Sequence, residues 1–271
     1  MMRALWTAAS GMVAQQTNVD TISNNIANVN TTGYKSEKTE FKSLLYQTLQ
    51  AKTTSKNGDQ KPIPAQVGLG ARVASTTSDY TNGAMVPSES PTAFALQGDG
   101  FFAVQGADGQ TYYTRNGNFN WSVGTTGTTL SNSDGYPVLD SNGNKIVIPN
   151  NITTSSVAVS EGGIVTYKNP AGTIVTMNAP IGVWQFNNPT GLDKMADNLL
   201  NVTRASGAPL NEATTNGLTK SKVKQGYLEG SNVQIADEMV DLIVAQRAYE
   251  MNSKAIQAAD EMLGQANQLR R

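Results

Sequence analysis

The C-terminal segment 231–271 carries the clearest hydrophobic pattern of the chain. Apolar or small residues recur there mostly in steps of three and four, the spacing that places side chains on one side of an α-helix. They are Met239, Leu242, Ala245, Tyr249, Ile256, Ala259, Leu263 and Ala266. Because the segment from 233 onward contains no proline and a single interior glycine, it predicts one long helix, with Ser231 or Asn232 as its N-cap.

A second stripe of the same spacing begins near the start of the chain. It consists of Leu5, Ala8, Met12, Gln15, Val19, Ile22, Ile26 and Val29. This pattern predicts a helix over residues 2–28, which ends where Asn28 to Gly33 supply turn-forming residues. Its polar positions are nearly all neutral, whereas a solvated helix usually carries charge pairs. Neutral amides and hydroxyls favour contact with other protein on several sides, and an ordinary surface helix is the alternative.

Between the two helices, residues 67–227 form short β-rich runs separated by turn pairs. Asn116-Gly117, Asp134-Gly135 and Asn142-Gly143 each stand between such runs, and pairs of this kind are strong hairpin signals. The pattern predicts an all-β domain of hairpins, a small sandwich or barrel, with aromatic residues such as Phe119 in its core. Residues 51–65 are polar, contain two prolines and are predicted to form a linker or extended loop.

These patterns predict an α+β fold, with two long terminal α-helices packed as a coiled-coil-like pair and a central, hairpin-rich all-β domain. The expected division is a helical domain of residues 1–30 and 230–271, an extended connecting region at 31–70 and a β domain at 71–229. We expect the helices to form one rod-like unit that assembles with further copies of the chain. The residues predicted to carry these axial contacts are Leu5, Met12, Val19, Ile22, Ile26, Met239, Leu242, Tyr249, Ile256 and Leu263.

Composition narrows the classes of function. Charged residues make up only 15 % of the chain, and the net charge of −1 argues against a dedicated nucleic-acid binder. There is no cysteine, which excludes disulfides and thiolate metal sites. There is also no histidine, the commonest general base and metal ligand, so that catalysis becomes a much weaker hypothesis. No catalytic, cofactor or metal site is predicted.

The start of the chain has some features of a cleavable leader, since Arg3 precedes a mildly apolar run at 4–14. Thr7, Ser10 and Gly11 interrupt that run, and the helical stripe continues beyond it to Ile26. We therefore expect this segment to belong to the folded protein. Nothing in the sequence approaches the ~20 consecutive apolar residues that cross a bilayer, so the chain is not expected to span a membrane.

Two patterns were considered as catalytic candidates. Asp237/Glu238 and Asp260/Glu261 are adjacent on a predicted helix, and neighbouring positions there point in different directions, so neither pair converges on one atom. Ser221 to Lys224 matches the S-x-x-K motif of certain serine enzymes, but no K-T-G motif accompanies it. A secreted β-domain serine hydrolase that uses Ser221 and Lys224 is therefore kept only as a remote alternative.

Several long motifs resemble the bacterial flagellar rod and hook family. TISNNIANVNTTGYK at 21–35 resembles its N-terminal signature, and GSNV, EMVDLI and QRAYEMNSK within 230–254 resemble its C-terminal one. GDGFF at 98–102 and YTRNGNF at 113–119 are similar to the start of the family's β domain. The signature positions are Asn24, Asn25, Asn28, Gly33, Tyr34, Lys35, Gln246, Arg247, Tyr249 and Asn252. The chain length and FKSLLYQT at 41–48 are most similar to the distal-rod members.

The resemblance implies a structural subunit of the distal rod that polymerises into a helical tube and transmits torque from motor to hook. It implies export through the flagellar type III apparatus without a cleaved leader, and a location in the basal-body rod. The implied partners are further copies of the chain, proximal rod and hook subunits, and surrounding bushing-ring proteins. A proximal rod or hook-like subunit is the alternative within the family.

Overall fold

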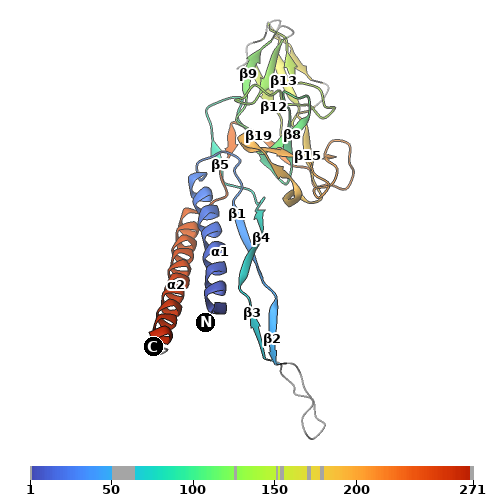
Figure 1. Ribbon diagram of the computed structural model, residues 1–271. Coiled ribbons are helices and arrows are strands. Elements are labelled where there is room, and N and C mark those ends of the chain that lie inside the picture. The colour runs from blue at the N-terminus through green and yellow to red at the C-terminus, as the bar shows by residue number, and fades with distance from the viewer. Residues whose placement is uncertain are drawn as a thin grey trace, which may run out of the picture. The chain divides into compact units, whose positions relative to one another are not determined.

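The computed structural model describes residues 2–50, 65–124, 127–150, 152, 156–169, 172–177 and 180–268. The chain divides into two compact units. The helical unit contains residues 1–27, 37–77 and 234–271, and the β unit contains residues 28–36 and 78–233. The predicted α+β class is confirmed, with one long helix at each end of the chain and a strand-rich middle (Figure 1). The predicted linker at 51–65 lies outside the described residues except for Ala65.

The helical unit is formed by two helices and four strands. Helix α1 (Met2–Ala27) and helix α2 (Ile235–Gln268) lie side by side and antiparallel, so that the start of α1 and the end of α2 are at the same end of the pair (Figure 1). Strand β1 (Glu37–Ser43) pairs with β4 (Ala71–Ser78). Strand β2 (Tyr46–Gln50) pairs antiparallel with β3 (Ala65–Gly68). Residues 37–50 and 65–70 of the predicted connecting region therefore belong to strands or their turns.

Helix α2 begins later than the capping residues predicted. The helix starts at Ile235, and the Glu238 N–H donates to the Gln234 carbonyl at 3.1 Å, so neither Ser231 nor Asn232 is the N-cap. The Asn232 side chain is used elsewhere in the β unit, where it accepts from the Ser36 N–H at 2.7 Å and donates to the Asp79 carbonyl at 2.8 Å. The prediction was wrong because these distant partners are invisible to a local capping rule.

The β unit is built around one six-stranded sheet. Its order is β16-β17-β8-β7-β15-β18, and neighbouring strands in it pair antiparallel. The strands are β7 (Phe101–Gln105), β8 (Thr111–Thr114), β15 (Val183–Gln185), β16 (Asp193–Lys194), β17 (Leu199–Asn201) and β18 (Leu210–Asn211). Two short 3-10 helices, η2 (Pro189–Gly191) and η3 (Ala196–Asn198), stand in the same part of the chain.

Smaller sheets complete this unit. Two have three strands, in the orders β11-β10-β9 and β12-β13-β14, and two are pairs, β19-β6 and β20-β5. Their strands are β5 (Met85–Pro87), β6 (Phe94–Gln97), β9 (Asn120–Val123), β10 (Thr128–Ser131), β11 (Val147–Ile148), β12 (Val157–Val159), β13 (Val165–Lys168), β14 (Ile174–Thr176), β19 (Lys222–Gln225) and β20 (Tyr227–Glu229).

Two of the three predicted hairpin turns are confirmed. The chain reverses at Asp134-Gly135 and at Asn142-Gly143, with Ser131 bridged to Pro137 and Leu139 bridged to Lys145. Asn116-Gly117 was wrong as a hairpin between the flanking strands, because β8 pairs with β7 and β17 while β9 pairs with β10. A side chain at Gly117 would lie 2.8 Å from the carbonyl carbon of Phe94, so the glycine permits a close backbone approach.

Aromatic side chains form the core of the β unit. Phe94, Phe101, Phe102 and Phe119 are completely or almost completely buried. The rings of Phe102 and Phe119 meet edge to face with centroids 5.2 Å apart, a favourable arrangement of two aromatic rings. The predicted core role of Phe119 is thus confirmed.

Candidate self-assembly surface of the helical unit

The seam between α1 and α2 is lined by small and neutral polar residues. Ala245 and Ala259 are the buried residues of α2. On α1, a side chain at Gly11 would lie 2.9 Å from the Asn252 amide nitrogen, so this pair of positions is in close contact. The buried residues of α1 are Ala8, Ala14, Thr21, Ile22 and Asn25. Small residues allow close approach of the backbones, and most of the larger apolar residues are left outside the seam.

Asn25 ties α1 to both of its neighbours. Its amide nitrogen donates to the Glu37 carbonyl at 2.8 Å and to the Glu238 carboxylate at 3.1 Å, and its amide oxygen accepts from the Glu37 N–H at 2.9 Å. Burial raises the pKa of Glu238, and the hydrogen bond from Asn25 opposes that shift. The side chain of Asn25 is thus a structural joint between α1, β1 and α2.

The ten predicted assembly residues differ in how far the structure buries them. Met239 and Tyr249 are exposed, with 54 % and 43 % of their surface accessible. Ile22 is buried against neighbouring elements. The seven half-buried members are Leu5, Met12, Val19, Ile26, Leu242, Ile256 and Leu263. The structure therefore assigns part of the predicted stripe to packing within the chain, and the assembly role of the ten residues stays a prediction.

A second apolar stripe on α2 was missed by the sequence analysis. Val240, Val244, Met251 and Met262 are each at least half exposed, and their separations of four, seven and eleven residues place them on one side of the helix. Helix α1 carries a corresponding outward row of Met2, Trp6 and Val13. We call these seven residues the outer stripes. The same three- and four-residue spacing rule would have found them, had each helix been searched for more than one apolar side.

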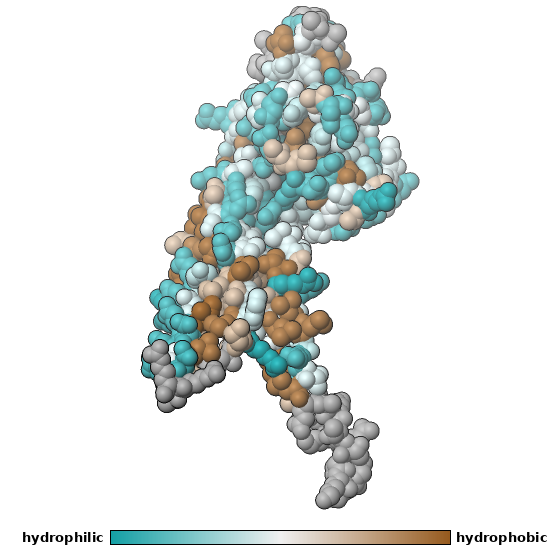
Figure 2. Space-filling view, in the orientation of Figure 1, coloured by the Kyte–Doolittle hydropathy of each residue, from teal (hydrophilic) through white to brown (hydrophobic). Residues whose placement is uncertain are grey.

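The surface of the helical unit is also hollowed. Gln16 and Val19 of α1 and Gln246, Tyr249 and Glu250 of α2 line an open groove of about 380 Å³. Figure 2 shows hydrophobic side chains gathered at the surface of this unit, whereas hydrophilic residues cover much of the visible β unit. A groove of this kind with apolar neighbours suits the side chains of another helix.

The strands of the helical unit expose apolar side chains too. Leu45 between β1 and β2 is 83 % exposed, and Tyr46 and Leu49 on β2 are more than half exposed. Phe41 on β1 and Leu69 after β3 add to the same set. The exposed leucines and tyrosine of the β2–β3 ribbon are typical of a segment that packs on another protein.

Other signature residues have structural roles or lie at the surface. The Gly33 N–H donates to the Glu229 carbonyl at 2.8 Å, Lys35 forms a buried ion pair with Glu229, and Tyr34 is buried. The side-chain oxygen of Asn28 accepts from the hydroxyl of Thr31 at 3.1 Å. Asn24, Gln246 and Arg247 are exposed, and Arg247 pairs with Glu250 at 2.9 Å.

The catalytic candidates find no support in the geometry. The Ser221 hydroxyl donates to the Glu212 carboxylate at 2.7 Å and accepts from the Gly100 N–H at 2.9 Å, so its hydrogen bonds hold the β unit together. Ser221 is buried, and within the described residues no group of three or more acidic side chains could hold a metal ion. No described helix is long and apolar enough to cross a membrane.

In comparison with known proteins, three family models match separate parts of the chain. The model of the flagella basal body rod protein matches residues 5–35, that of the flagellar hook protein FlgE/F/G D1 domain matches 95–167, and that of the flagellar basal body rod FlgEFG protein C-terminal region matches 224–269.

Several full-length relatives share one name, flagellar basal-body rod protein FlgG. The Borreliella burgdorferi protein is 45 % identical over all of both chains. That of Agrobacterium fabrum is 42 % identical over 96 % of this chain and 97 % of its own. The Bacillus subtilis protein is 36 % identical over the full length of both.

Proposed function

We propose that this chain is a distal rod subunit that polymerises through the outer stripes of its helical unit. The chain belongs to the flagellar basal-body rod protein family and is a structural subunit of that rod. The observation that carries the proposal is the distribution of apolar side chains. Seven large ones on α1 and α2, the outer stripes, lie exposed at helical spacing, while the fully buried positions of these helices are small or polar apart from Ile22.

Burial of the outer stripes supplies the driving force. Trp6, Val244 and Met251 are 71 %, 60 % and 65 % exposed in the single chain. Fully burying a side chain of this size is worth ~1.5–3 kcal/mol, so several such residues per contact are sufficient for stable association. Helices of further copies are the proposed occupants, because the α1 and α2 stripes are both apolar and both run along helices, as ridges-into-grooves packing requires.

The ten residues predicted from the sequence divide into two proposed roles. Met239 and Tyr249 contact neighbouring copies directly, and Tyr249 does so at the edge of the groove it lines. The buried Ile22 and the seven half-buried members hold the α1–α2 pair in the shape that presents the outer stripes. The exposed apolar residues of β1, β2 and β3 form a further contact with neighbouring copies.

The finer parts of the function follow from polymerisation. A polymer whose helices pack along their outer stripes against neighbouring copies is stiff, and stiffness is what torque transmission requires of a rod subunit. We propose proximal rod and hook subunits as end-to-end partners, bushing-ring proteins as neighbours of the outer wall, and export through the flagellar type III apparatus without a cleaved leader. No catalytic step and no cofactor are proposed.

A matched pair of substitutions on α2 tests the proposal. Val244→Asp puts a charge into an outer stripe, and burying that charge without a partner costs several kcal/mol at every subunit contact, so rod formation and motility should be lost. Gln257→Asp adds the same charge at an exposed position of the same helix outside the stripe and should assemble normally. Polymerisation is measured by electron microscopy and sedimentation, and circular dichroism checks that both monomers keep their helices.

Normal rods from the Val244→Asp chain would contradict the proposal. Leu242→Asp serves as a third variant: it lies at the half-buried edge of the seam and should lose assembly together with helix pairing. The position in the rod is tested separately by electron microscopy of basal bodies from a deletion strain. A rod that stops before its distal half supports a distal subunit, and a missing proximal rod would favour the proximal alternative.

A further inference from the structure

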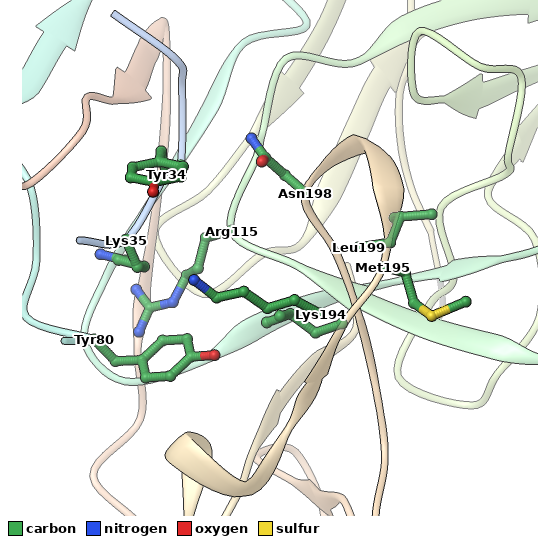
Figure 3. Close-up of a pocket in the computed structure, with 10 residues that line it drawn as sticks. Tyr34, Lys35, Tyr80, Arg115, Lys194, Met195, Asn198 and Leu199 are labelled. Carbon is green, nitrogen blue, oxygen red and sulfur yellow. The ribbon is translucent and has the colours of Figure 1, made fainter. Parts of the chain in front are cut away.

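The β unit contains a small cavity surrounded by positive charge. Its volume is about 60 Å³, and the cations among its lining residues are Lys35, Arg115 and Lys194 (Figure 3). No acidic residue is among the described residues that line it. Because one water occupies roughly 30 Å³ of liquid, the cavity has room for a group of a few heavy atoms and not for a nucleotide or sugar.

A buried carboxylate in contact with two of these cations is already shared between them. Glu229 is almost completely buried and pairs with the Lys35 ammonium at 2.6 Å and with the Arg115 guanidinium at 3.5 Å. The Lys35 ammonium also donates to the Thr81 carbonyl at 2.6 Å. Two buried cations therefore share the Glu229 carboxylate, and Asp79, Asp99 and Glu212 add electrostatic attraction.

The guanidinium of Arg115 has one N–H donor without a hydrogen-bond acceptor among the described residues. Its side chain is 2 % exposed, its Nη1 donates to the Asn82 side-chain oxygen at 3.1 Å, and its guanidinium lies 4.8 Å from the centroid of the Phe101 ring. Its Nε is buried and has no hydrogen-bond partner within the described part of the chain. Leaving a charged donor unpaired inside a protein is costly, so the group indicates a missing acceptor.

Lys194 brings a third cation to the same cavity. Its ammonium lies 5.6 Å from the centroid of the Tyr34 ring. Figure 3 shows this ammonium extending towards the guanidinium of Arg115, with the rings of Tyr34 and Tyr80 on either side. Like charges repel at short range, and an anion between them would turn that repulsion into two attractive contacts.

We propose that this cavity binds one carboxylate group, held by the Nε of Arg115 and the ammonium of Lys194. The size of the cavity, the three cations in its lining and the unpartnered Nε of Arg115 all fit a carboxylate. Burial lowers the pKa of both Lys35 and Arg115, and a bound anion would oppose that shift. The carboxylate comes either from an Asp or Glu side chain of a neighbouring copy, a source that rests on the proposed function, or from a free small carboxylate.

The monomer tests the binding chemistry without any assembly. Sodium acetate is titrated into the full-length ¹⁵N-labelled chain, with sodium chloride at equal ionic strength as the reference, and the arginine Nε–H resonances are followed by NMR. The Arg115 resonance should shift and saturate with acetate, while that of the exposed Arg204 should not. Lys194→Met should weaken acetate binding about three- to tenfold, equivalent to ~1 kcal/mol. Lys168→Met, at an exposed site on β13, should leave it unchanged.

In the titration, an Arg115 shift that does not saturate, or an equal shift with chloride, would overturn the proposal. The source is read from rods by electron cryomicroscopy. Density entering the cavity from a neighbouring subunit assigns a side chain, and isolated density assigns a free carboxylate, whereas a cavity with neither overturns the proposal. If rods do not form at all, polymerisation fails as a function while the acetate titration still stands.

Discussion

The β unit and the helical unit of this protein bury different kinds of side chain. The β unit packs Phe94, Phe102 and Phe119 against aliphatic residues in its core. The two helices of the helical unit bury mostly small or polar residues, with Ile22 as the exception, and expose Trp6 and Met251. In the β unit, contacts within one chain are enough to bury the large apolar side chains of the core. A seam of mostly small residues leaves large apolar side chains exposed, and the proposed assembly would bury them.

Truncating one large apolar side chain in each unit should give the largest contrast. Phe102→Ala removes a ring that is fully buried in the β unit and should lower the free energy of unfolding by ~3–5 kcal/mol. Trp6→Ala removes a larger ring that is mostly exposed and should change the stability of the monomer by less than ~0.5 kcal/mol, while weakening polymerisation. Urea unfolding of the two monomers measures the first effect and sedimentation the second. Equal losses of monomer stability would remove the contrast between the units.

Hydrogen exchange should show the same contrast in one experiment. In a dilute monomer, amides of β6 and β7 should be the best protected, and the termini flanking a folded core of about 67–227 should exchange much faster or be cleaved by protease. The reason is that helices whose outer stripes have no partner are held by few large buried contacts. Polymerisation should then protect α1 and α2. Full protection of both helices in the dilute monomer would contradict the assembly argument.

The smallest expected effect concerns Glu238 at the seam. Its pKa is raised in the folded chain, mainly by burial, so the folded state holds the proton more tightly than the unfolded state. The stability from this group is therefore present below its unfolded pKa of about 4.5 and is lost as the pH rises through the folded value. Glu238→Gln keeps an acceptor for Asn25 and removes the charge, so it should slightly raise the protection of α1 and α2 at pH 7.

The pH dependence provides the control for Glu238. The gain from Glu238→Gln should disappear below about pH 4.5, where the glutamate itself is protonated in both states. Asp237→Asn is the matched variant, since Asp237 is exposed on the neighbouring position and should give no comparable change. A gain that persisted at low pH would show that the charge of Glu238 is not its cause.

Several features were readable from local sequence because local geometry creates them. The three- and four-residue spacing arises within a single helix, and it predicted α1 and α2 almost to their ends. Asp134-Gly135 and Asn142-Gly143 predicted turns because the left-handed backbone of Gly135 and Gly143 needs no distant partner. The family motifs likewise required no knowledge of packing.

Other features depended on partners far away in the chain. Asn232 is spaced correctly for a helix cap, but its side chain is engaged by Ser36 and Asp79. The buried side of α1 includes Thr21 and Asn25, because β1 and α2 both pack on it and offer hydrogen-bond partners there. Polarity alone would assign these residues to the surface.

By itself, then, the sequence determined which segments are helices, where most hairpins turn and which family the chain resembles, since each of these depends on neighbours a few residues apart. Only the tertiary structure decided which side of each helix packs against other elements of the chain and which side stays exposed. It alone brought Lys35 to Glu229, 194 positions away, and set Arg115 and Lys194 around one cavity. Burial and charge pairing are properties of the packed chain, and no local pattern encodes them.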